Sequence, residues 1–264
     1  MAYIDGSTFS VGIVIGTDPE VALPVTKFSV KPVSAVRRVH TAGKRTPAAI
    51  FPAEVKFSGT IEFPVTEDVL DIMDLVNSVD GATLTTFTVN DGVKKYTGCK
   101  CAGVKVGVKL NEEAVVSFDF AATAVTTGAA VTPPTPDNFY VGHNITLTGV
   151  AAMDAESVDV TVTNSLKEIF GMKGAGRTPV HLAEGYQTIS ADIKYLEDPA
   201  VDVSAASPSL IASATVVLSG NDSGTFTITL TNLHAADSNK DAEPEDIVRF
   251  GLKYEGSTIA FSTT

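Results

Sequence analysis

The chain repeats one loop-and-strand motif at a constant spacing, and this repeat constrains the fold more than any other feature. The tripeptide Arg-Thr-Pro at residues 45–47 returns at 177–179, half a chain length later in a sequence of 264 residues. One spacing holds across nearly the whole unit; it aligns 57–63 with 189–195 and 113–120 with 245–252. A long internal repeat of this kind predicts two structural units with a common plan.

Alternation of apolar and polar side chains predicts that each unit is built from strands. Phe57, Ile61 and Phe63 fall on one face of an extended segment, and polar residues fall on the other. Hairpins correspond as well, because 83–89 and 93–98 flank an Asn-Asp-Gly turn as 212–218 and 225–230 flank a second Gly-containing turn. The chain is therefore predicted to be mainly β.

One amphipathic helix is expected over residues 66–77, with Thr66 as its cap. Its apolar stripe consists of Val69, Ile72, Met73 and Val76. The equivalent segment, 197–208, has a weaker stripe and ends at a proline, so a shorter helix is expected there. Clustered Pro, Thr and Gly between the halves predict an extended linker. The chain is thereby divided into a first domain, 1–128, a linker, 129–138, and a second domain, 139–264.

The charge balance argues against a protein that grips nucleic acid by neutralising phosphates. The net charge is −12, and it is uneven: residues 1–132 hold 12 Lys and Arg against 14 Asp and Glu, whereas residues 133–264 hold 7 against 17. The N-terminus lacks the pattern of a secretion signal, and no apolar run is long enough to span a membrane. The expectation is a protein made in the cytosol, without membrane insertion.

Motifs for catalysis or cofactor binding are missing from the sequence. The four histidines are scattered without metal-ligand spacing. Cys99 and Cys101 form an i, i+2 pair on one face of a strand, with little chain to close a relaxed disulfide. They could contribute to a metal site, but without a second pair a buried or half-buried strand position is favoured. No nucleophile or phosphate-binding signature is present. The sequence therefore predicts a non-enzyme without a cofactor.

One segment is a weak candidate for calcium. Asp237, Asn239 and Asp241 occupy the first, third and fifth positions of a calcium-binding loop. The match then fails, because Ala242 stands where glycine is needed and Val248 stands where a bidentate glutamate should be. An acidic surface loop is the favoured interpretation of this segment.

The residues before each repeated strand carry a family resemblance. SAVRRVHTAGKRTPAAIFPAEVKFSGTIEF and SLKEIFGMKGAGRTPVHLAEGYQTISADIKY each place a long, partly basic loop between two strands. This plan resembles the tail tube proteins of long-tailed bacteriophages and related archaeal viruses, over roughly residues 10–125 and again over 139–262. The resemblance implies two tandem tail-tube-like β-sandwich or half-barrel domains, each with a flanking helix, strong in the first and weak in the second.

The resemblance also implies a function. Six units of this family form a ring whose inner sheets join into a barrel, and stacked rings make a hollow tube for the viral genome. A chain with two fused units would need three copies, so a homotrimer with pseudo-sixfold symmetry is expected, in the virion tail after assembly in the host cytoplasm. The implied partners are further copies of the chain, the tape-measure, tail-tip and terminator proteins, and viral DNA that passes without specific binding. Polar, small and acidic side chains are expected to line the channel.

Cations in the two long loops are candidates for contacts between subunits or rings. They are Arg37, Arg38, Lys44 and Arg45 in the first loop and Lys167, Lys173 and Arg177 in the second. Two interpretations stay open: these cations contact the acidic second half of a neighbour, or they are solvated loop charges of little energetic value.

A second function class also fits the duplication and the linker. Two tandem β-sandwiches could belong to an adhesin or a carbohydrate-binding surface protein. This alternative lacks support from a signal segment, from disulfides or from surface aromatic residues, since aromatic residues make up only 7% of the chain.

Overall fold

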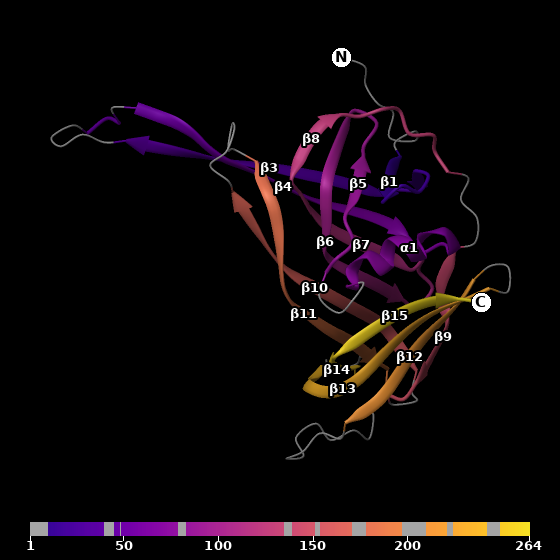
Figure 1. The fold of residues 1–264 in the computed structure, drawn as a ribbon. Coiled ribbons are helices and arrows are strands. Elements are labelled where there is room, and N and C mark those ends of the chain that lie inside the picture. Colours follow the sequence, from indigo (N-terminus) through magenta and orange to yellow (C-terminus); the bar gives the residue numbers. More distant parts are fainter. Residues whose placement is uncertain are drawn as a thin grey trace.

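The protein is mainly β in the computed structural model, with fifteen strands and one short helical segment (Figure 1). The residues described by the structure are 10–39, 45–47, 49–78, 83–134, 139–150, 154–170, 178–196, 210–220, 224–241 and 249–264. Every strand pair among them is antiparallel. No helix in this part of the chain has the length and hydropathy of a membrane span.

The first half forms two β layers that share one long strand, β6. Its strands are β1 (Val11–Ile15), β2 (Val21–Leu23), β3 (Lys27–Val39), β4 (Ala49–Pro64), β5 (Phe87–Asn90), β6 (Lys94–Lys109), β7 (Val115–Ala122) and β8 (Ala124–Thr127). One layer has the order β3-β4-β7-β6, and the other has the order β2-β1-β5-β6 with β8 on the far side of β6. The 16 residues of β6 are enough to pass from one layer into the other.

The second half has the same strand order. Its strands are β9 (Tyr140–Thr148), β10 (Ala155–Phe170), β11 (Pro179–Tyr195), β12 (Ile211–Gly220), β13 (Thr225–Asp241), β14 (Arg249–Gly256) and β15 (Thr258–Thr263). One layer runs β10-β11-β14-β13, and the other runs β9-β12-β13 with β15 paired to the opposite edge of β13. Strand β13 therefore takes the place that β6 has in the first half.

The two halves are joined strand to strand. β6 pairs with β10 from Lys109↔Ser157 to Gly103↔Thr163. This pairing unites one layer from each half into a continuous sheet of the order β3-β4-β7-β6-β10-β11-β14-β13, which we call the eight-stranded sheet. Because the two halves share hydrogen bonds and a sheet, they cannot reorient freely relative to each other.

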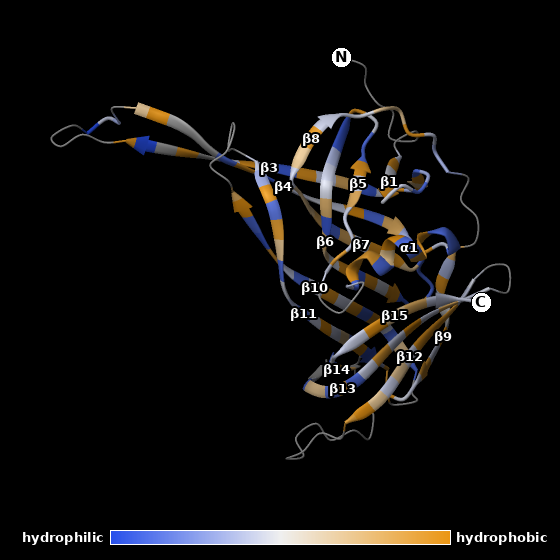
Figure 2. Cartoon of the chain, viewed as in Figure 1, coloured by the Kyte–Doolittle hydropathy of each residue, from blue (hydrophilic) through white to orange (hydrophobic). Residues whose placement is uncertain are grey.

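The core follows the predicted alternation. Ile61, Phe63 and Phe118 are fully buried on one face of the eight-stranded sheet. The Phe87 ring from the second layer lies edge-on to Phe118 with 5.5 Å between ring centroids, which packs the two layers together. Buried residues of both halves form one contiguous cluster, and Figure 2 shows apolar and polar colours alternating along the strands.

The helix expected over residues 66–77 is shorter and less regular than predicted. The segment consists of a 3-10 turn at Glu67–Val69, α1 at Leu70–Met73 and a second 3-10 turn at Asp74–Val76. Its apolar stripe is buried as predicted. Thr66 stands at the N-cap position, but its side chain makes no capping hydrogen bond, and its backbone forms a β-bridge with Phe139. The weaker helix predicted over 197–208 lies outside the described residues.

The two long loops expected before the repeated strands are largely paired strands. β3 and β4 pair from Lys27↔Glu62 out to Val39↔Ala49, and this hairpin, which we call the first arm, projects away from the body (Figure 1). β10 and β11 pair out to Phe170↔Pro179 and form the second arm. Val and Ile recur in both arms, and such β-branched residues favour the extended backbone over an open loop.

The first strand of the second half, β9, requires a glycine at position 142. Gly142, in β9, donates its amide to Glu112 O at 2.9 Å, and a Cβ at this position would lie 1.9 Å from Lys109 O. We expect Gly142→Ala to lower the free energy of unfolding by about 1 to 3 kcal/mol, because the backbone of one half must move. Chemical denaturation measures this, with Thr146→Ala on an exposed site of β9 as the control expected within about 0.5 kcal/mol of wild type.

Candidate assembly surfaces

A buried ion pair fastens the two halves at the place where β6 leaves the eight-stranded sheet. Lys100 Nζ, in β6, donates to Glu184 Oε1 and, at 3.2 Å, to Leu182 O, both in β11. The side chain of Lys100 is 7% exposed and that of Glu184 is 18% exposed. The amide of Leu84 also donates to Glu184 Oε1, at 3.1 Å. Glu184 thus accepts hydrogen bonds from two separate segments of the first half.

The pKa of Glu184 is lowered in this position. Burial by itself raises the pKa of the carboxyl, but the hydrogen bonds from Lys100 and Leu84 and the charge of Lys100 outweigh that effect. The carboxylate is consequently held ionised opposite a buried ammonium. Removal of either partner would leave an uncompensated charge between the halves.

Two amides extend this polar cluster to the helical segment. Asn164 Nδ2, in β10, donates to Val76 O at 2.8 Å and to Cys101 O at 3.2 Å. Gln187 Nε2, in β11, donates to Val76 O at 3.0 Å and to Asn164 Oδ1 at 3.2 Å. Sequence reasoning missed the cluster; the one available signal was a lysine between two cysteines in a strand that is otherwise apolar at this point.

The outer strands of the eight-stranded sheet leave two edges open. β3 is hydrogen-bonded to β4, and no described strand pairs with its other edge from Ser29 to Val33. β13 pairs with β14 from His234 to Asp241, and no described strand pairs with its other edge there. Long open edges template pairing with another chain unless they are covered.

The face of this sheet that is turned away from the core carries paired charges of both signs. Lys27 Nζ bonds Glu62 Oε1 at 2.6 Å, and Lys105 Nζ lies 3.1 Å from Asp159 Oδ1 across the β6–β10 joint. In the second half, Asp237 is directly opposite Lys253. Small and polar residues separate these pairs. We call this the polar face, and it is charge-balanced rather than predominantly acidic.

The arms carry exposed apolar side chains among the described residues. In the first arm, Val36 is 56% exposed and Ile50 is 59% exposed, and Ile50 pairs with Arg38, two residues along from Val36, so the three share one face. The second arm exposes Ile169, Val180 and Tyr186. Exposed apolar residues gathered on a projecting element are typical of a protein contact.

The cations predicted for these contacts lie on the arms where the structure describes them. Arg38 is on β3, Arg45 is at the tip, and Lys167 is on β10; all three are exposed. Arg37 is on β3, but its side chain lies outside the described residues, as do Lys44, Lys173 and Arg177 altogether. The outer described end of the second arm lies against the base of the first, where Lys56 Nζ bonds Glu168 Oε2 at 2.9 Å.

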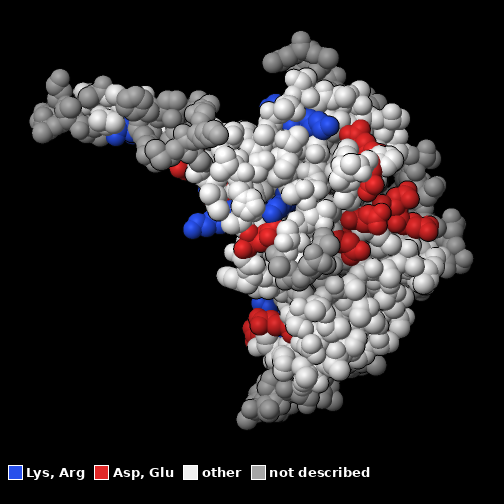
Figure 3. Space-filling model, viewed as in Figure 1, with Lys and Arg blue, Asp and Glu red and all other residues white. Residues whose placement is uncertain are grey.

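A compact acidic surface lies in the first half, on the outer side of the helical segment (Figure 3). It consists of Glu67, Asp68, Asp71 and Asp74, all exposed, and we call it the acidic helix face. Burial and the neighbouring Asp71 raise the pKa of Asp74. None of the ion pairs among the described residues involves this face.

A comparison with protein families identifies the family of the chain that carries these surfaces. A family model described as phage tail tube protein matches residues 6–262, nearly the whole chain. The chain belongs to the phage tail tube protein family. A search among curated proteins finds no match. Membership makes this a structural component of the virion tail that assembles with itself and with other tail proteins.

The cysteines of this tail tube protein are buried, as the sequence predicts. Cys99 and Cys101 are both fully inaccessible in β6. Burial raises the pKa of the Cys99 thiol to about 12 and that of Cys101 further still. Thiols held neutral in this way are inert as nucleophiles.

The structure describes only the first part of the segment considered for calcium. Residues 237–241 are the extended end of β13, in register with 249–253 of β14, and residues 242–248 lie outside the described residues. Among the described residues no cluster of three or more His, Cys, Asp or Glu could hold a metal ion.

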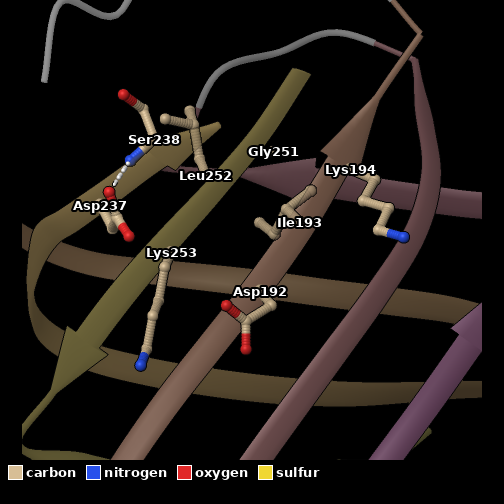
Figure 4. A pocket seen from close by; sticks show the side chains of 8 residues that line it. All are labelled: Asp192, Ile193, Lys194, Asp237, Ser238, Gly251, Leu252 and Lys253. Carbon is tan, nitrogen blue, oxygen red and sulfur yellow. Dashed lines mark hydrogen bonds between the residues drawn. The ribbon is translucent and has the colours of Figure 1, made fainter. Parts of the chain in front are cut away.

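An open pocket of about 210 Å³ lies beside this segment, across β11, β14 and β13 (Figure 4). Asp192, Lys194 and Lys253 project from it, and the Ser238 amide donates to Asp237 Oδ1 at 2.8 Å. The lining holds carboxylates, ammonium groups and apolar side chains, without a nucleophile beside a base. The pocket lies at the open edge of β13.

Proposed function

We propose that three copies of this chain close a ring with pseudo-sixfold symmetry, and that rings stack into the hollow tube through which the viral genome passes. Each chain supplies two tube units, 1–128 and 139–264, joined by the linker 129–138, which derive from an internal duplication. The observation that carries the proposal is the β6–β10 joint. It pairs the two halves edge to edge in the manner that successive chains need.

Ring closure follows from the two open edges. The free edge of β3 lies at one end of the eight-stranded sheet and the free edge of β13 at the other. Pairing β13 of one chain with β3 of the next is a head-to-tail contact, which closes when the rotation per chain is right. Three chains would form a barrel of about 24 strands without exposed edges.

The polar face of the sheet lines the channel in this proposal. Lysines on it are paired with carboxylates, as in Lys27–Glu62 and Lys105–Asp159. A lysine that is already neutralised attracts a DNA phosphate weakly, and carboxylates repel it. DNA therefore passes without specific binding across a lining whose charges are balanced, in place of the polar, small and acidic side chains expected from the family resemblance.

The arms join one ring to the next. The first arm carries Arg38, Arg45 and the exposed Val36 and Ile50, and it projects from the body. The acidic helix face offers uncompensated carboxylates of opposite sign on the first half, and the acidic second half offers others. The ends of the tube are completed by tape-measure, tail-tip and terminator proteins, after assembly in the host cytoplasm.

Electron microscopy and mass measurement of the purified protein test this function. We expect rings or hollow filaments, and ring particles of three times the 27.5 kDa chain mass with six similar lobes. Rings of six chains would contradict the fused pseudo-sixfold arrangement. Two-lobed monomers that persist at high concentration, even with the tail-tip complex added as an initiator, would contradict assembly and favour a tandem β-sandwich adhesin.

A further inference from the structure

We infer that the joint between successive chains pairs Ser29–Val33 of β3 with Asp237–Asp241 of β13 in one specific register, and that charge on these strands prevents the wrong halves from joining. The inference rests on the proposed ring, and it names the second copy's β13 as the strand that covers β3. Its template is the β6–β10 joint inside the chain, which has the same strand neighbours on both sides.

Pairing partners establish which residues are equivalent on the β3 side. Lys31 pairs with Ser58 in β4, and Thr161 pairs with Ser190 in β11. Ser58 and Ser190 are equivalent in the sequence repeat. Lys31 is therefore the structural counterpart of Thr161, and Val33 is by the same steps the counterpart of Thr163.

The same reasoning fixes the β13 side. Lys105 pairs with Ser117 in β7, and Asn239 pairs with Gly251 in β14. Ser117 and Gly251 are counterparts, because they pair with Glu62 of β4 and Lys194 of β11, which the repeat aligns. Their separation is 134 residues, so the predicted alignment of 113–120 with 245–252 at constant spacing is wrong by two residues. Since Lys105 is opposite Thr161 inside the chain, its counterpart Asn239 is opposite Lys31 between chains. The full register is Ser29↔Asp241, Val30↔Lys240, Lys31↔Asn239, Pro32↔Ser238 and Val33↔Asp237.

This register leaves no like charges directly opposite each other. Lys31 is opposite an asparagine position and lies diagonally between Asp237 and Asp241, where cross-strand neighbours still interact. The signs of the charges are exchanged between the two joints. In the internal joint the lysine, Lys105, is on β6 and the carboxylate, Asp159, is on β10.

Exchanged joints are penalised by the same residues. If β6 of one chain took β3 of another, Lys105 would lie directly opposite Lys31. If β13 took β10, Asp241 would lie directly opposite Asp159. Like charges directly opposite destabilise a strand pair, so first and second halves alternate around the ring.

Pro32 makes the joint between chains weaker than the internal one. The Val65 amide donates to Ala114 O, so odd residues of β4 point their hydrogen bonds to β7 and even residues point theirs to β3. Phe57, opposite Pro32, is therefore bonded to β7, and the nitrogen of Pro32 faces the open edge without a hydrogen. Its counterpart inside the chain, Val162, has an amide to donate. When a ring dissociates, the β3–β13 joint between chains should therefore open before the β6–β10 joint inside a chain.

Engineered disulfides test the register. Val33 and Asp237 are both exposed and, because odd residues of β3 bond to β4, they would form a non-hydrogen-bonded pair about 4.5 Å apart at Cα, within disulfide range. We expect the Val33→Cys/Asp237→Cys protein to give covalent trimers on mild oxidation, with trimer as the largest product. The native Cys99 and Cys101 are buried and do not compete.

The control is Lys31→Cys/Asp237→Cys, which would be directly opposite only if the strands slipped by two residues. In the inferred register this pair is diagonal, and we expect roughly tenfold less covalent trimer from it. Rings that cross-link chiefly through the control pair would overturn the register and leave the proposed ring intact. Monomers without any cross-link would overturn both.

A charge exchange tests the role of Lys31 separately. Lys31→Asp is expected to raise the protein concentration needed for ring assembly about tenfold, because it places like charges across the joint. Adding Asp237→Lys to the same chain should restore assembly. Equal assembly by Lys31→Asp and wild type would overturn the charge argument.

Discussion

Glu184→Ala is expected to lower the free energy of unfolding by about 3 to 5 kcal/mol, the largest effect of any single substitution considered. The substitution removes the carboxylate that faces Lys100 and leaves a buried ammonium with only the Leu182 carbonyl as partner. It also takes away the acceptor of the Leu84 amide. Because these groups bridge the two halves, the urea midpoint should fall for the whole chain in one transition.

Two further variants separate the ion pair from its surroundings. Glu168→Ala breaks the more exposed ion pair with Lys56 and should lower the free energy of unfolding by no more than about 1 kcal/mol. Lys100→Met combined with Glu184→Leu removes both charges and should restore most of the free energy of unfolding that Glu184→Ala loses. If Glu184→Ala costs no more than Glu168→Ala, the cluster does not fasten the halves.

The Lys100–Glu184 pair makes the stability of the fold depend on pH in the acid range, and the pKa of Glu184 sets the direction of that dependence. That pKa is lower in the folded protein than in the unfolded chain, where a glutamate has a pKa of about 4.3. The contribution of Glu184 to stability is then complete above the unfolded value and lost as pH falls through the folded value. Wild type should therefore lose stability relative to the Lys100→Met/Glu184→Leu variant as pH falls from about 5 to 3.

Val36→Asp combined with Ile50→Asp is expected to stop tube growth while leaving the rings intact. Both side chains are more than half exposed on the first arm, so the two substitutions should change the free energy of unfolding of the single chain little. In a stack of rings they would be buried, and placing two carboxylates in that contact carries a large desolvation cost. We expect filament length, measured by electron microscopy, to fall to single rings or short stacks.

The control for the arm is Val93→Asp. Val93 is 54% exposed, like the arm residues, but it lies at the turn between β5 and β6. Long filaments from this variant and none from the arm variant would locate the contact on the arm. Normal tubes from both variants would contradict the role proposed for the arms.

Sequence alternation was a reliable guide to the core and an incomplete guide to the surface. The buried positions of Ile61, Phe63, Cys99 and Cys101 follow from a two-residue period, and the β5–β6 hairpin follows from its Asn-Asp-Gly turn, in which Gly92 has a φ of 82°. The arms were predicted as loops because glycine, proline and basic residues interrupt them. Cross-strand pairing held these residues in strands despite their weaker propensity.

The helical segment shows the same competition between local and tertiary preference. Its apolar stripe was sufficient to predict which residues are buried. Thr66 was predicted as its cap, and it stands at the N-cap position without a capping hydrogen bond while its backbone pairs with Phe139 from the start of the second half. Contacts between residues so far apart in the chain leave no local trace in the sequence.

The sequence by itself determined that the chain is β-rich and that its cysteines are buried, because the period of apolar residues is a local property. Its repeat predicts two units with a common plan. Only the tertiary structure decided that β6 lies beside β10, that Lys100 meets Glu184 and that β3 and β13 keep open edges. Strand order and register depend on which edges find each other in space. Two halves with the same internal pattern can be joined in several ways without any change in that pattern.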